Sequence, residues 1–206
     1  MRYTGPKVKI LRRLDLKELP GLTRKNPMKK RDKENEKKKR PKKQSLYSIR
    51  LIEKQKLRFN FCLTNHQFLN YVKRAQKTAG PTGEILIKLL ESRFDNIVFR
   101  LKLAPTINAA RQLITHGHFQ INKKKVTIPS YECKINDEIL FSSNLPRLEE
   151  KKSNQEKLPN YLLWDENRHI GTICQEISLK DPVIIQYYDN LELRILYVIE
   201  HFARQL

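Results

Sequence analysis

The hydrophobic pattern of residues 93–141 changes its period, and this change constrains the fold more than any other feature of the chain. From Phe94 to Leu101, and again from Ile107 to Ile114, apolar residues recur at helical spacing. From Phe119 onward they alternate with polar residues, which is the pattern of a half-buried strand. The segment is therefore expected to form two short helices followed by a small β unit.

Turn and cap residues place the boundaries of these elements. Pro105 stops the first helix, Thr106 opens the second, and Gly117 closes it in a left-handed conformation. The strands are assigned to Phe119 and Ile121, to Val126 and Ile128, and to Ile139 and Phe141, with Asn122 and Lys123 in the first turn.

Residues 45–92 are expected to form a helical domain, with ordered structure beginning near Ser45. Thr64 and Gln67 fit a capping box at the start of one helix. A long apolar stripe then begins after Thr82, and it suits either one helix or two helices that meet near Asp95.

Two outer segments complete the predicted α+β chain. Residues 1–44 form a basic, disordered-like N-terminal arm, and residues 142–206 form a polar connector followed by a C-terminal α+β segment. In that last segment, the runs 183–185 and 193–199 are expected to be strands because they are short and apolar.

Positive charge is concentrated near the N-terminus. The net charge is +20, and residues 1–43 hold 18 Lys and Arg against 5 Asp and Glu. Residues 24–43 have no apolar face to bury, so they are expected to track phosphates or, alternatively, to act as a solubilising linker. Such an imbalance favours a polyanionic partner, because bound phosphates release their counterions.

Several classes of protein are disfavoured by the residues. Cys62, Cys133 and Cys174 have no C-x-x-C spacing, which disfavours a zinc site and a disulfide framework. No apolar run reaches the ~18–20 residues of a membrane span, and no catalytic signature or signal peptide occurs. We therefore expect no enzyme activity, cofactor, metal, membrane association or small-molecule substrate.

A basic surface is expected where the second helix of the 93–141 segment meets the first strand. Arg93, Arg100 and Arg111 are placed on the solvent side of the helices, beside two histidines and a lysine-rich hairpin tip. Alternatively, Arg93 pairs with Asp95 or Glu91, and the lysines only deter pairing of the sheet edge. A second basic cluster is expected on the helix that follows Ser45. The candidate RNA-binding residues are Arg93, Arg100, Arg111, His116, His118, Asn122, Lys123, Lys124, Lys125, Arg50, Lys54, Lys56, Arg58, Arg12 and Arg13.

Several stretches resemble, in order, the S-four family of small-subunit ribosomal proteins. They are RYTGPKVKILRRL, LPGLT, RLIEKQKLRF, TGEILIKLLESRFDNIVFRL, INAARQLITHGHFQIN, TIPSY and EHFAR. The chain departs from the family pattern at three positions. Lys123 replaces the glycine of an Asn-Gly turn, Asn136 replaces the glycine of a Gly-Asp pair, and Cys62 stands where a glycine commonly follows an aromatic residue.

The resemblance implies a fold and a function. It implies an α-L-type RNA-binding module at 93–141, in which Arg93, Arg100, Arg111, His116 and His118 match the family. It also implies a primary rRNA-binding protein that binds the 5′ domain of small-subunit rRNA, nucleates assembly of the subunit body, and contributes to translational accuracy with neighbouring ribosomal proteins. The opening at Met1 is plastid- or cyanobacterial-like, which predicts a plastid-encoded protein of the chloroplast ribosome, or otherwise of a bacterial-type cytoplasm.

Two other functions use the same module. A free RNA chaperone or translational repressor would bind RNA away from ribosomes. An RNA-modifying enzyme would need a catalytic domain with an Asp-bearing loop, and residues 142–206 are too few for one.

Overall fold

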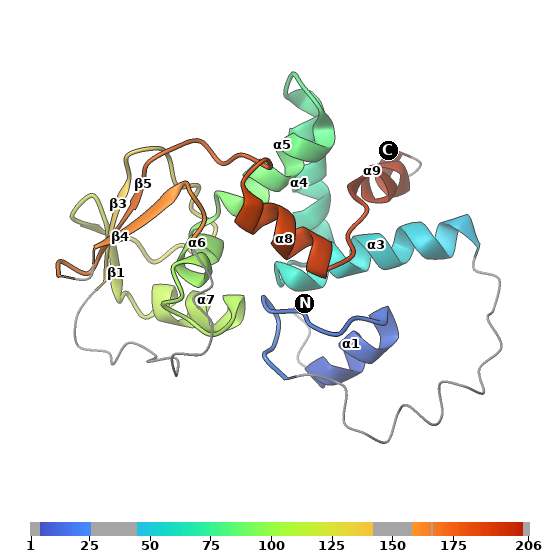
Figure 1. Cartoon of the computed structure of the whole chain (residues 1–206), viewed down its shortest axis with the longest axis horizontal. Helices are drawn as coiled ribbons and strands as arrows, with labels where there is room; N and C mark the ends of the chain where they lie inside the picture. Colours follow the sequence, from blue (N-terminus) through green and yellow to red (C-terminus); the bar gives the residue numbers. More distant parts are fainter. Residues whose placement is uncertain (1–4, 26–44, 142–157, 166, 204–206) are drawn as a thin grey trace.

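The structure, a computed structural model, describes residues 5–25, 45–141, 158–165 and 167–203, which form two lobes (Figure 1). The helical lobe contains α3 (Leu46–Asn60), α4 (Asn65–Lys77), α5 (Thr82–Glu91), α8 (Pro182–Asn190) and α9 (Ile195–Ala203). The sheet lobe contains α6 (Phe94–Arg100), α7 (Ile107–Thr115) and the strands β1 (Phe119–Ile121), β2 (Lys124–Lys125), β3 (Glu138–Phe141), β4 (Leu162–Asp165) and β5 (Ile170–Ile173). The chain is therefore α+β, as expected.

The sheet is antiparallel, with the strand order β2-β1-β3-β5-β4. Phe119 and Ile121 of β1 are buried opposite Phe141 and Ile139 of β3, which confirms the predicted alternation. The Phe119 ring packs edge-on against Phe94 of α6, with their centroids 5.7 Å apart. The second strand was misplaced, because β2 comprises two lysines and Ile128 is 60% exposed.

The C-terminal segment is divided between the lobes, and its predicted strands were wrong. Residues 183–185 lie in α8 and residues 195–199 lie in α9, whereas β4 and β5 extend the sheet of the sheet lobe. Asp181 caps α8 by accepting a hydrogen bond from the Val183 N–H, and Pro182 occupies the first turn. Helix α9 packs against α3, α4 and α5, and this tertiary packing buries the apolar runs that resembled strands.

Residues 5–25 are folded, so the expectation that order begins near Ser45 was wrong for this part of the arm. Helix α1 (Lys7–Leu14) buries Ile10, Leu11 and Leu14 near α3, and the following turn buries Leu16, Leu19 and Leu22. Gly21 fits against the backbone of Asn60, and its carbonyl accepts a hydrogen bond from the Ile107 N–H. The lysine-rich stretch 26–44 lies outside the described residues.

The apolar stripe after Thr82 forms two helices rather than one. Helix α5 ends at Glu91 and α6 begins at Phe94, with Arg93 as the extended N-cap, slightly before the expected junction near Asp95. Thr64 and Gln67 form the predicted capping box, and Thr106 caps α7. Among the described helices, none is long and apolar enough to cross a membrane.

A left-handed residue follows each of four helices, α3, α6, α7 and α8. The N–H groups of Leu63 and Cys62 donate to the carbonyls of Arg58 and Phe59, which is the pattern of a Schellman motif. Gly117 has the left-handed position after α7, with φ 79°, as predicted. Residues with a Cβ have it after the other three helices, namely Cys62 (φ 50°), Lys102 (φ 59°) and Glu192 (φ 47°).

Cys62→Gly is expected to raise the free energy of unfolding by about 0.5–1 kcal/mol, because glycine removes most of the cost of left-handed backbone. Urea unfolding of the two proteins measures this change. Cys62→Ala is the matched control, since it removes the thiol but keeps the Cβ. A gain in Cys62→Ala equal to that in Cys62→Gly would mean that the thiol, and not the backbone, is the source.

Two basic side chains meet between α3 and α9. Lys54 Nζ lies 3.2 Å from His201 Nε2, and both residues are buried beside Tyr47, Arg50 and Phe202. A hydrogen bond between them requires a neutral imidazole as acceptor. Burial and the nearby Lys54 and Arg50 lower the pKa of His201 below its ordinary value.

The fold is therefore expected to lose stability in mild acid. The unfolded chain protonates His201 as the pH falls below about 6.5, whereas the folded chain resists this protonation. Thermal unfolding should show a lower melting temperature at about pH 5.5 than at about pH 7.5. This difference should shrink in His201→Gln, which keeps an acceptor for Lys54 but does not titrate. His66→Gln, at an exposed histidine of α4, should behave as wild type.

Candidate nucleic-acid interface

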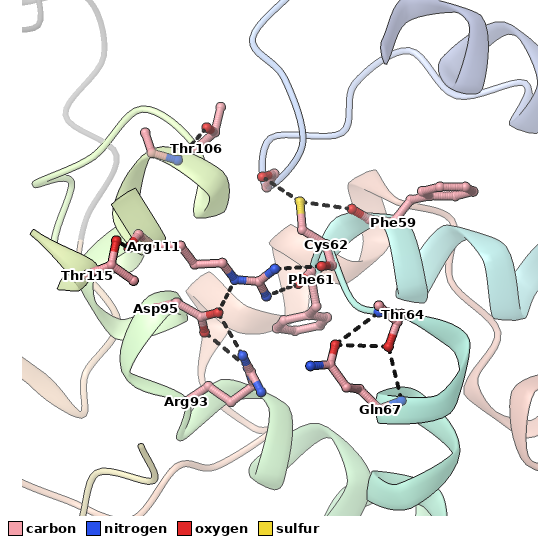
Figure 2. Close-up of polar contacts among 12 residues, drawn as sticks. Phe59, Phe61, Cys62, Thr64, Gln67, Arg93, Asp95, Thr106, Arg111 and Thr115 are labelled. Carbon is pink, nitrogen blue, oxygen red and sulfur yellow. Dashed lines mark hydrogen bonds and ion pairs between the residues drawn. The ribbon is translucent and has the colours of Figure 1, made fainter. Parts of the chain in front are cut away.

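A buried carboxylate organises the start of the sheet lobe (Figure 2). Asp95 lies on α6 and is fully buried between two arginines. Arg93 donates to both of its oxygens, at 3.0 and 2.8 Å, and Arg111 donates from Nε to Oδ2 at 2.6 Å. We call Arg93, Asp95 and Arg111 the Asp95 cluster.

Arg111 also caps the end of α3. Its Nη1 donates to the carbonyl of Cys62 at 2.6 Å, and its Nη2 donates to the carbonyl of Phe61 at 2.8 Å. These carbonyls lie at the negative end of the helix dipole, where a cation is favoured. Arg111 therefore joins α7 to α3, which are far apart in the sequence.

A second buried network surrounds Glu91 at the end of α5. Arg100 donates to both carboxylate oxygens, at 3.1 and 2.6 Å, and Tyr188 of α8 donates at 2.6 Å. Burial alone would raise the pKa of Glu91, but Arg100, Tyr188 and Asn96 hold that pKa below its ordinary value. The same Arg100 guanidinium stacks on the Tyr187 ring, 3.7 Å from its centroid.

The expectation that Arg93, Arg100 and Arg111 lie on the solvent side was wrong. They are 4%, 7% and 5% exposed, and their guanidinium groups hydrogen-bond within the protein. Arg111 lies four residues after Ile107 and three before Ile114, which places it on the buried face of α7. Helix α6 is buried on nearly all sides, so Arg100 has no solvent side to occupy. The alternative pairing of Arg93 with Asp95 is the one observed.

The basic cluster predicted on α3 is largely turned inward. Lys54 and Lys56 are buried, and Lys56 pairs with Glu53 at 3.0 Å. Arg50 pairs with Glu200 of α9 at 2.7 Å. Arg58 donates to Gln55 at 3.3 Å and lies over the Phe59 ring. The expected common basic surface on α3 was therefore wrong for Lys54 and Lys56, and Arg50 serves the α3–α9 contact.

Exposed and half-buried basic groups gather instead around the end of α7. The rings of His116 and His118 stack with centroids 6.2 Å apart, on either side of Gly117. The Lys125 side chain crosses Gly117 so closely that a Cβ there would lie 2.1 Å from Lys125 Cε. Lys123 and Lys124 continue this surface at the hairpin tip. We call His116, His118, Lys123, Lys124 and Lys125 the hairpin surface.

The Asn122 side chain links the hairpin tip to β3 and to the residue before it. Its amide donates to Asp137 Oδ1 at 2.8 Å and accepts from the Glu138 N–H at 3.0 Å. Asn122 and Lys123 have φ values of 49° and 66°, the positive values that a type I′ turn requires. The Asn122 side chain is thus engaged in holding β1 to β3.

Helix α1 carries further exposed cations. Arg12 and Arg13 lie on its exposed face, as do Lys7 and Lys9. The spacing of Ile10, Leu11 and Leu14 in the sequence already indicates this face, since the basic residues occupy the positions between the apolar ones. Within the described residues, no group of three or more His, Cys, Asp or Glu is placed to hold a metal ion.

Comparisons with known proteins match two family models to consecutive parts of this chain. Residues 2–91 match the ribosomal protein S4/S9 N-terminal domain, and residues 92–139 match the S4 domain. The chain is 45% identical to the small ribosomal subunit protein uS4c of Pinus koraiensis, over 99% of this chain and 98% of the relative. It is 43% identical to uS4c of Oltmannsiellopsis viridis, over 98% and 99%, and 42% identical to uS4 of a Nostoc species, over 99% and 98%. The chain therefore belongs to the uS4 family of structural, non-enzymatic proteins of the small ribosomal subunit.

Proposed function

We propose that this protein is a structural constituent of the small ribosomal subunit that binds the 5′ domain of its rRNA. The observation that carries the proposal is the hairpin surface, where three lysines of the β1–β2 hairpin and two histidines gather at the end of α7. A-form RNA is recognised mainly through phosphates, 2′-hydroxyls and shape, and these side chains supply donors for such groups. The names of the relatives support the ribosomal assignment.

The hairpin surface and the exposed face of α1 are the proposed RNA contacts. Arg12 and Arg13 lie on α1, which contacts α3, and Gly21 in the turn after α1 fits against Asn60 at the end of α3 that Arg111 caps. The buried Arg93, Arg100, Arg111, Lys54 and Lys56 are assigned to the protein interior, because their polar atoms already have partners there. The proposed rRNA contacts thus keep part of the set expected from the sequence, and the exposed face of α1 adds Lys7 and Lys9.

The wider role follows from the family. Early binding to the 5′ domain would nucleate assembly of the subunit body, and contacts with neighbouring ribosomal proteins would contribute to translational accuracy. The similarity to uS4c and cyanobacterial uS4 supports a plastid ribosome, with a plastid gene as its source, or otherwise a bacterial-type ribosome.

The wild-type protein is expected to bind a 5′-domain transcript selectively in the presence of excess tRNA. The logarithm of the affinity should fall linearly with the logarithm of salt concentration, because phosphates and salt ions compete. Filter binding or fluorescence anisotropy over a salt series measures both quantities. Equal affinity for the transcript and for tRNA would contradict the proposal and would favour a free RNA chaperone.

Lys125→Ala is expected to weaken binding several-fold and to reduce the salt slope by about one unit, since one phosphate contact is lost. Lys73→Ala is the matched control, because Lys73 is an exposed lysine of α4 and does not belong to the hairpin surface. An unchanged slope in Lys125→Ala, or an equal loss in Lys73→Ala, would show that the hairpin surface is not the contact.

A further inference from the structure

We propose that Arg111 is a positioning residue for rRNA binding, and that it acts through the protein rather than by contacting RNA. Together with Arg93 and Asp95, it holds the sheet lobe in one orientation against the helical lobe. This inference rests on the proposed function, since it concerns how the same surface is presented to rRNA.

Arg111 makes one of the two hydrogen-bonded connections by which the Asp95 cluster joins the lobes. Its guanidinium bonds to Asp95 within the sheet lobe and to the carbonyls of Phe61 and Cys62 at the end of α3 (Figure 2). Because only 5% of the residue is exposed and all three guanidinium nitrogens have acceptors, a phosphate has no access to it. Its positive charge is therefore used inside the protein.

Arg93 makes the second connection. Its Nη1 donates to the Tyr71 hydroxyl of α4 at 2.6 Å, while its Nε and Nη2 hold Asp95. Arg93 and Arg111 thus share the Asp95 carboxylate, and they bond to two different helices of the helical lobe, α4 and the end of α3. Two separated attachment points restrict both the tilt and the rotation of α6 and α7 relative to that lobe.

The orientation of α7 determines where the hairpin surface lies. Arg111 is on the buried face of α7, and His116 is the C-cap of the same helix, with Lys125 lying across Gly117. At its other end, the Ile107 N–H donates to the Gly21 carbonyl, in the turn that follows α1. The hairpin surface and the basic face of α1 are therefore both positioned relative to the end of α3.

Fixed spacing between two basic surfaces favours a partner of fixed shape. Folded RNA presents its phosphates at set distances, so a protein with loosely connected lobes would lose conformational entropy on binding. Weakening the Asp95 cluster should lower the affinity without changing the number of phosphates engaged. The salt slope counts those phosphates, so it separates a positioning residue from a contact residue.

The test compares Arg111→Lys and Tyr71→Phe with Lys125→Ala on the 5′-domain transcript across a salt series. Lysine keeps the charge of Arg111 but lacks the planar fork that reaches three acceptors. Tyr71→Phe removes only the hydroxyl that Arg93 uses, so it is the milder variant if Arg111→Lys folds poorly. We expect about a tenfold loss of affinity in Arg111→Lys, on the order of 1.4 kcal/mol, and a several-fold loss in Tyr71→Phe, both with the wild-type slope.

Hydrogen exchange without RNA supplies an independent readout. The Ile107 amide, which bonds to Gly21 in the turn after α1, should exchange faster in Arg111→Lys. The Asn122 amide, which bonds to Glu138 within the sheet, should be unchanged. This pattern would show that the contacts between the lobes loosen while the sheet stays folded.

Two results would overturn the inference. A reduced salt slope in Arg111→Lys, like that expected for Lys125→Ala, would mean that Arg111 contacts a phosphate. Wild-type affinity in both Arg111→Lys and Tyr71→Phe would mean that the Asp95 cluster does not position the RNA surface. Neither result is the same as a failure of selective binding by the wild-type protein, which would contradict the proposed function itself.

Discussion

The Asp95 carboxylate, buried between two arginines, is the interaction on which the arrangement of the two lobes depends. Moving three charged groups out of water costs free energy that ion pairing alone does not always recover. Here the remaining donors are satisfied as well, because Arg93 reaches the Tyr71 hydroxyl and Arg111 reaches the carbonyls at the end of α3. Removing Asp95 would leave both cations buried without a counter-ion, a change that typically costs about 3–5 kcal/mol. The cluster is thus stable as a complete set, and the bonds that satisfy it hold the lobes together alongside the Glu91 network.

The basic residues therefore have two different roles, one in the protein interior and one at the surface. Glu91 and Asp95, only four positions apart around the α5–α6 junction, retain Arg93, Arg100 and Arg111 in the interior. The three lysines of the hairpin surface and His116 are exposed, and His118 is half-buried. Arginine suits the interior role because its planar fork reaches several acceptors and it remains charged when buried. A net charge of +20 therefore overstates the charge that meets RNA, since part of it stabilises the fold.

Local signals in the sequence predicted those helices, turns and strands whose ends are determined by neighbouring residues. The other elements depend on tertiary contacts. The capping box at Thr64, the turn at Gly117 and the alternation in β1 and β3 each depend on neighbouring residues, and each was predicted. Helices α8 and α9 were missed because short apolar runs suit a buried helix as well as a strand. The buried side of Arg111 was indicated by its spacing from Ile107, but its acceptors on Phe61 and Cys62 lie some fifty positions earlier in the chain. No local pattern in the sequence indicates a hydrogen-bond acceptor so distant along the chain. A basic residue on a buried helix face is therefore easily assigned to the surface.

The hairpin tip shows how local strain and function are balanced in the same turn. Lys123 has a φ of 66°, a conformation that costs a residue with a Cβ roughly 1–2 kcal/mol. Asn122 offsets part of this cost through its bonds to Asp137 and to the Glu138 N–H, which hold the turn against β3. A glycine at position 123 would relieve the strain but would also remove a cation from the outermost point of the hairpin surface. If Lys123 contacts a phosphate as proposed, that contact would offset the cost of the strained backbone in the complex. On the proposed role, the turn would therefore contribute less to the stability of the isolated protein than to the affinity of its complex with RNA.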